Sequence, residues 1–115
     1  MADEQFRDPN RRAFARTVIR QPATVTSGET SVRVQTLDVG QGGMCFIARR
    51  PIGPGTRCTI AFDVPLGAGP VEISASLKVV YSSYLEAGQF KIGTVFTELG
   101  DDAARVLARY AAPNP

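Results

Sequence analysis

Val71-Glu72-Ile73-Ser74-Ala75-Ser76-Leu77-Lys78-Val79-Val80-Tyr81 is the stretch that decides the fold of this chain. Its apolar and polar side chains alternate with a period of two residues, which is the period of a β-strand. The apolar face is expected to lie against a core. It carries Val71, Ile73, Ala75, Leu77, Val79 and Tyr81. Such alternation is typical of antiparallel sheets, in which one face is buried and the other meets solvent.

Five further segments have strand-like patterns, and turns or loops rich in glycine and proline separate them. They are residues 17–26, 31–39, 44–48, 59–64 and 90–96. Pro22 interrupts the first of these strands, which suits a sheet edge or a bulge. The segment 44–48 is apolar at every position, which indicates a strand buried on both faces.

Only the C-terminal end of the chain has helical spacing. Asp101 suits the N-cap position, and Pro113 is a stop signal. An apolar stripe between them consists of Ala103, Val106, Leu107 and Tyr110. We therefore predict an all-β fold, a six-stranded antiparallel β-barrel with a C-terminal α-helix, because closing the sheet removes its exposed edges.

The 115 residues have room for a single domain. We expect residues 1–10 to be a flexible tail and residues 11–112 to form the domain. No apolar run approaches the ~18 residues of a membrane span, and the N-terminus lacks the apolar region of a signal peptide. We therefore expect a cytoplasmic protein without membrane insertion, in which Cys45 and Cys58 are reduced, buried thiols.

The chain contains no histidine, which excludes imidazole-based nucleophile pairs and imidazole metal sites. The carboxylate pair Asp101-Asp102 is better explained by helix capping than by acid–base chemistry. The sequence therefore predicts a binding protein and no enzyme, with no catalytic residue, no metal and no cofactor.

Four arginines without an intervening acid lie close together near the N-terminus: Arg11, Arg12, Arg16 and Arg20. A solvated basic tail would explain the R-x-x-x-R spacing of Arg12 and Arg16. Alternatively, an arm anchored by Phe14 wraps their guanidinium groups around an anionic ligand, because arginine grips phosphate with two parallel hydrogen bonds.

A glycine-rich turn with one carboxylate follows: Asp38-Val39-Gly40-Gln41-Gly42-Gly43. One interpretation is a tight strand connection, in which the glycines adopt positive φ and Asp38 caps its own turn. The other is a ligand site, in which the lack of side chains lets a ligand approach the backbone. Asp38 then accepts hydrogen bonds from a guanine edge.

These two motifs, Arg11-Arg12-x-x-x-Arg16 and Asp38-x-Gly40-x-x-Gly43, resemble the two-part signature of PilZ domains, R-x-x-x-R followed by D/N-x-S-x-x-G. The loop Ile52–Thr56 and the strand segment Gly93–Phe96 are similar to further family features. The resemblance covers residues 11 to 110. It implies a six-stranded barrel that binds bacterial cyclic di-GMP as a receptor and acts on a protein partner.

The resemblance also implies roles for single residues. Arg12 and Arg16 would contact phosphates and guanine from the arm, with help from Arg11. Asp38 and Gly43 would lie on the turn that holds a guanine.

Two glycines complete the implied site. Gly93 would lie beneath the ligand. Gly40 departs from the family pattern, which has serine there; the missing hydroxyl would weaken binding by about tenfold.

Two other functions compete with a nucleotide receptor. The first is a PilZ-like adaptor that binds no nucleotide and acts by protein contact in motility or pilus assembly. The second is a small barrel that binds nucleic acid. The net charge of only +2 and the absence of tryptophan disfavour that function, so we expect no nucleic-acid partner.

Overall fold

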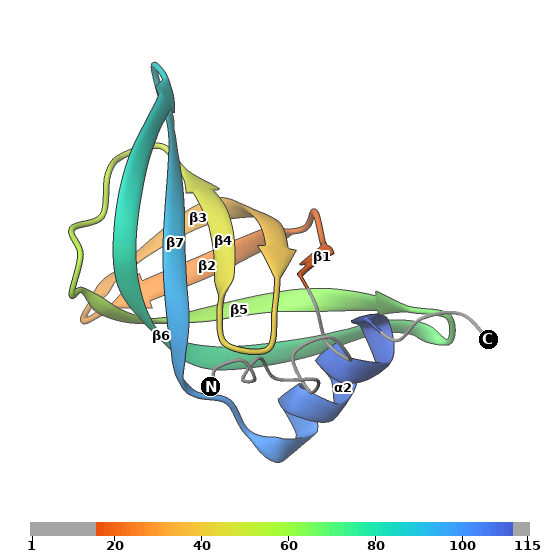
Figure 1. The fold of residues 1–115 in the computed structure, drawn as a ribbon. Helices are drawn as coiled ribbons and strands as arrows, with labels where there is room; N and C mark the ends of the chain where they lie inside the picture. Colours follow the sequence, from red (N-terminus) through yellow and green to blue (C-terminus); the bar gives the residue numbers. More distant parts are fainter. Residues whose placement is uncertain (1–15, 112–115) are drawn as a thin grey trace, which may run out of the picture.

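The computed structural model describes residues 16–111. The expected tail of residues 1–10, with Arg11 and Arg12, lies outside the described residues. Seven strands and one helix follow one another along the chain (Figure 1): β1 (Thr17–Val18), β2 (Pro22–Ser27), β3 (Thr30–Val39), β4 (Met44–Ala48), β5 (Arg57–Leu66), β6 (Gly69–Glu86), β7 (Gln89–Glu98) and α2 (Asp101–Ala111).

Six of these strands form a ring-like sheet in the order β3-β2-β5-β6-β7-β4, and the pairing of β4 with β3 closes the ring. Each pair of neighbours runs antiparallel. Turns at Gly28, Gly67–Ala68 and Ala87–Gly88 connect the three hairpins. The predicted all-β antiparallel fold with a C-terminal helix is confirmed.

The predicted number of six strands is wrong, because the described residues contain seven. The segment 17–26 is divided into β1 and β2, and β1 pairs with the far end of β3. Between them the chain turns Ile19 into the core, where it is buried. Buried Thr36 fixes this crossing: its hydroxyl donates to the Ile19 carbonyl at 2.5 Å and accepts from the Gln21 N–H at 2.8 Å. Pro22, which has no N–H, then starts β2.

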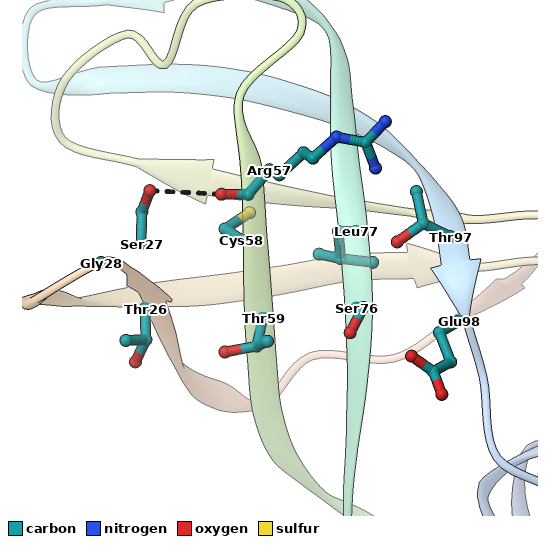
Figure 2. A pocket seen from close by; sticks show the side chains of 10 residues that line it. All are labelled: Thr26, Ser27, Gly28, Arg57, Cys58, Thr59, Ser76, Leu77, Thr97 and Glu98. Atoms are coloured by element: carbon teal, nitrogen blue, oxygen red, sulfur yellow. Dashed lines mark hydrogen bonds between the residues drawn. The ribbon is translucent and has the colours of Figure 1, made fainter.

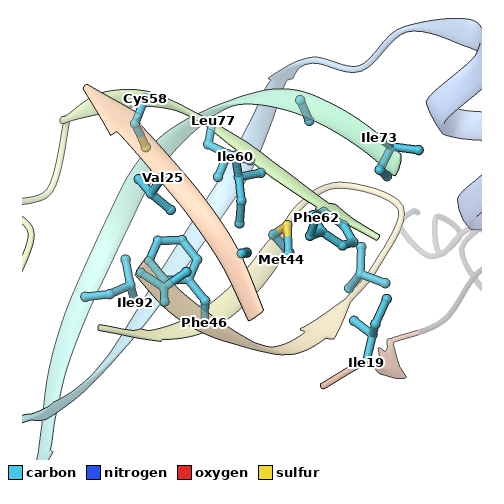
Figure 3. Close-up of a cluster of buried hydrophobic side chains, with 14 of the residues drawn as sticks. Ile19, Val25, Met44, Phe46, Cys58, Ile60, Phe62, Ile73, Leu77 and Ile92 are labelled. Atoms are coloured by element: carbon cyan, nitrogen blue, oxygen red, sulfur yellow. The ribbon is translucent and has the colours of Figure 1, made fainter. Parts of the chain in front are cut away.

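Apolar side chains from the inner faces of the ring strands fill the core (Figure 3). The largest of those that are fully buried are Phe46, Ile19, Met44, Ile60, Leu77 and Ile92. Cys58 belongs to this core, and burial raises the pKa of its thiol. Both Cys45 and Cys58 are free and buried, as predicted.

The helix α2 packs its predicted stripe against β5 and β6, with Ala103 and Leu107 buried. It begins at Asp101, so Gly100 stands at the N-cap position expected for Asp101. Near its other end the Tyr110 hydroxyl donates to the Val18 carbonyl at 2.9 Å. This bond attaches β1, and with it the chain that leads to Arg16, to the helix.

A register shift in β6 corrects a second prediction. Val79 faces Thr94 of β7, whereas Tyr81 faces Gly93, so the intervening Val80 forms a bulge. A bulge moves the next side chain to the opposite face of a strand. Tyr81, expected on the inner face, therefore lies on the outer face and is 40% exposed.

The ring closes where the glycine turn meets β7. A Cβ atom on Gly43 would lie 2.0 Å from the carbonyl oxygen of Thr94, so only glycine fits there. The contact is reinforced because the Phe96 N–H donates to the Gly42 carbonyl at 2.8 Å. The Thr94 hydroxyl also donates to the Met44 carbonyl at 2.8 Å. The turn and β7 are thereby held in direct backbone contact.

We predict that Gly43→Ala lowers the free energy of unfolding by about 3 kcal/mol, because the methyl group forces the turn away from β7. Gly42→Ala is the matched control: its Cβ would meet no atom within 4 Å. It should change stability by less than about 0.5 kcal/mol. Urea unfolding measures both variants, and equal losses would contradict this account of ring closure.

Candidate ligand-binding site

Four neighbouring strands present one residue each in a single row on the outer face of the sheet. Asp38 of β3 pairs with Cys45 of β4, and Cys45 pairs with Gly93 of β7. Gly93 in turn pairs with Tyr81 of β6. Two irregularities produce this row, one at Leu37 and one at Val80, because each turns the following residue outward.

Arg16 lies across this row, and its guanidinium group contacts Asp38, Cys45 and the backbone of Gly43. Its Nη2 donates to Asp38 Oδ1 at 2.5 Å and to Cys45 Sγ at 3.2 Å. Its Nη1 lies 3.5 Å from the carbonyl oxygen of Gly43. The side chains of Arg16 and Asp38 remain 51% and 27% exposed, so a ligand in solution can reach both groups.

The glycine-rich turn packs against the Arg16 side chain. Gly40 is buried, and a Cβ atom there would lie 2.8 Å from Arg16 Cδ. The Gly40 N–H donates to the Gly43 carbonyl at 2.8 Å, which closes the turn. The turn is the expected tight connection, between β3 and β4, but its glycines do not adopt the expected positive φ. Two of the glycines are needed because other parts of the chain come close to their backbone: Arg16 at Gly40, and β7 at Gly43. Asp38 binds Arg16 and is not a cap of its own turn.

Tyr81 covers Gly93 at the other end of the row. A Cβ atom on Gly93 would lie 2.1 Å from Tyr81 Cε2, so the ring rests directly on the glycine backbone. The Tyr81 hydroxyl lies 3.4 Å from Cys45 Sγ. This hydrogen bond, together with burial, raises the pKa of Tyr81 to about 12, so the phenol stays protonated at neutral pH.

These side chains border an open hollow of about 420 Å³. It is lined by Arg16, Asp38, Cys45, Val80, Tyr81, Lys91, Gly93 and Thr94. Its rim combines two cations, one carboxylate and one aromatic ring. Such a set can bind phosphate through the cations, accept hydrogen bonds at the carboxylate, and stack a flat base.

Five of the seven predicted site residues meet here: Arg16, Asp38, Gly40, Gly43 and Gly93. Arg11 and Arg12 lie outside the described residues. The sequence prediction missed Cys45, Tyr81 and Lys91. The pairing of Tyr81 with Gly93 depends on the bulge at Val80, which simple alternation does not reveal.

A second hollow, of about 560 Å³, lies elsewhere on the outer surface (Figure 2). Hydroxyl-bearing side chains dominate it, and Arg57 and Glu98 are its charged residues. One row of paired residues crosses it, namely Thr26, Thr59, Ser76 and Glu98. None of the predicted site residues borders it, and it holds one cation instead of a group of them.

The single helix of residues 16–111 is α2. This part of the chain has no helix of the length and apolar character needed to cross a membrane. It also has no group of three or more acidic, cysteine or histidine side chains placed to hold a metal ion.

Solved structures similar to this one include proteins from two bacteria. The MotI/DgrA inhibitor of motility from Bacillus subtilis superposes with a TM-score of 0.74 at 14% identity, over 85% of this chain and 48% of that one. PlzA from Borreliella burgdorferi, solved in complex with c-di-GMP, gives 0.62 at 14% identity, over 84% of this chain and 39% of PlzA. At this identity the likeness establishes the fold. The chain spans less than half the length of either protein.

The sequence itself gives a family match. No curated protein sequence matches the chain significantly. The model of the PilZ domain, however, matches residues 10–112, which include both predicted motifs and every described strand and helix. The chain therefore belongs to the PilZ domain family.

Proposed function

We propose that this chain is a cyclic di-GMP receptor whose ligand binds in the hollow between Arg16, Asp38 and Tyr81. The observation that carries the proposal is the meeting of Arg16 and Asp38, 22 positions apart in the chain, above the Gly40–Gly43 turn. Membership of the PilZ family and the PlzA complex with c-di-GMP support it. The role is binding without catalysis, in the cytoplasm.

The chemistry of the hollow matches the two parts of the nucleotide. A guanidinium group binds phosphate or the O6 and N7 acceptors of guanine with paired hydrogen bonds, as Arg16 would. The Asp38 carboxylate would accept from the N1–H and N2–H₂ groups of the same base edge. Arg11 and Arg12 would add cations from the preceding segment, close to where Arg16 enters the site.

The ion pair between Arg16 and Asp38 does not prevent binding. A solvent-exposed ion pair contributes about 1 kcal/mol or less. Charge-assisted hydrogen bonds from Arg16 to phosphate and from guanine to Asp38 would replace it. In this mechanism the ligand separates the two side chains and orders the N-terminal arm against the ring, which changes the surface offered to a protein partner.

The second candidate function is a PilZ-like adaptor without nucleotide. Two observations favour it: Asp38 is already bound to Arg16, and Gly40 provides no hydroxyl. The ligand titration below distinguishes the two functions, because an adaptor would give no response to cyclic di-GMP.

We predict that isothermal titration with cyclic di-GMP gives heat at tens of micromolar ligand. Arg16→Ala and Asp38→Asn should each weaken binding by about tenfold or more, since each removes a charge-assisted contact. The Arg105–Asp102 pair on α2 supplies a matched control, as it is also an exposed arginine–aspartate pair. Arg105→Ala should bind like the wild type. No heat with the wild type would exclude the receptor function.

We also predict that Gly40→Ser tightens cyclic di-GMP binding by about tenfold, because the new side chain displaces Arg16 from Asp38 and adds a hydroxyl group. The predicted displacement follows from the 2.8 Å approach of a Cβ atom to Arg16 Cδ. Gly42→Ser enters open space and should leave the affinity unchanged. Weaker binding by Gly40→Ser would show that the close contact between Gly40 and Arg16 serves the ligand complex.

A further inference from the structure

Four exposed arginines gather on the surface beside the hollow that we propose binds cyclic di-GMP, called the ligand hollow below. They are Arg20, Arg33, Arg49 and Arg50. They line two adjoining hollows of about 550 and 600 Å³, and Arg33 and Arg49 border both. We call this surface the arginine face. Arg33 lies on β3, Arg49 and Arg50 begin the loop that follows β4, and Arg20 precedes β2.

The arginine face has no compensating acid. No aspartate or glutamate lines either hollow. The ion pairs within residues 16–111 are Arg16–Asp38 and Arg105–Asp102, and neither involves the face. Gln35 pairs with Ile47, so the same register continued by two residues places Arg33 opposite Arg49. Like charges directly opposite one another destabilise a sheet, and a bound anion would relieve that repulsion.

Apolar groups lie between these cations. Val32, Ala48, Pro51 and Ile52 line one hollow, and Val32 is 43% exposed. Leu37 and Ile47 contribute to the other, where both are half-buried. No aromatic side chain lines either hollow. The face is therefore suited to a ligand that carries several negative charges and aliphatic groups between them.

We propose that the arginine face binds an extended acidic segment of a partner protein, in which carboxylates alternate with aliphatic side chains. The carboxylates form ion pairs with the guanidinium groups of the arginines, and the aliphatic side chains enter the two hollows. A single-stranded nucleic acid fits less well, because its bases would find no ring to stack on. A lipid surface also fits less well, because the apolar groups lie in hollows between the charges.

The position of the face connects it with the ligand hollow. The two adjoin in one row on the same outer sheet surface: Gln35 and Ile47 line a hollow of the arginine face, and Lys91, which pairs with Ile47, lines the ligand hollow. Along β4 the distance from Cys45 to Arg49 is four residues, or about 14 Å. A segment bound to the arginine face would therefore lie next to the cyclic di-GMP site. The inference itself goes beyond the proposed function and does not depend on nucleotide binding.

Fluorescence anisotropy with a labelled, glutamate-rich peptide containing interspersed valine and isoleucine tests the inference on the full chain without cyclic di-GMP. Arg33→Gln/Arg49→Gln should weaken binding by about tenfold or more. Arg57→Gln is the matched control, because Arg57 is an exposed arginine on β5 that borders neither hollow. It should leave binding within about twofold of wild type. Circular dichroism checks that all variants fold alike.

Three outcomes would overturn the inference. The first is no binding of the peptide by the wild type. The second is equal loss in the double variant and the Arg57 control, or loss in neither. The third is tighter binding of single-stranded RNA or of phosphatidylserine vesicles through Arg33 and Arg49 than of the peptide. Because both variants retain Arg16 and Asp38, a cyclic di-GMP titration of the same proteins reports separately on the proposed function.

Discussion

The direct contact between the glycine turn and the backbone of β7 is the constraint on which the rest of this structure depends. Gly43 has no side chain, and a Cβ atom would overlap the Thr94 carbonyl oxygen. That approach lets β4 pair with both β3 and β7 and so close the ring. The same turn carries Gly40, which lies against Arg16. Ring closure and the position of Arg16 beside the ligand hollow thus depend on two close contacts of the same turn.

A second constraint sets which side chains face the proposed ligand site. The irregularities at Leu37 and Val80 bring Asp38 and Tyr81 to the outer face, in one row with Cys45 and Gly93. Regular strands would have placed Tyr81 in the core. The core in turn fixes the approach of Arg16, because buried Ile19 and the hydrogen bonds of Thr36 hold the segment just after it.

Local patterns in the sequence predicted most of the fold. The alternation from Val71 to Val79 and the spacing of Ala103 and Leu107 are local signals, and the strands and helix that they predicted are present. The division of residues 17–26 into two strands and the outward turn of Tyr81 were not predicted. Both depend on how one strand pairs with another, which a single strand pattern does not contain. The motifs located Arg16, Asp38 and three glycines, but the contribution of Cys45 and Lys91 follows only from strand register.

The central claim is that the outer row between Arg16 and Tyr81 receives cyclic di-GMP. An amide NMR titration of isotope-labelled protein tests it most directly, because it locates the bound ligand residue by residue. The account predicts that the largest shifts fall on Arg16, Gly40, Gly43 and Gly93. Shifts confined to the hydroxyl-lined hollow around Arg57 and Glu98, or no shifts at saturating ligand, would contradict it.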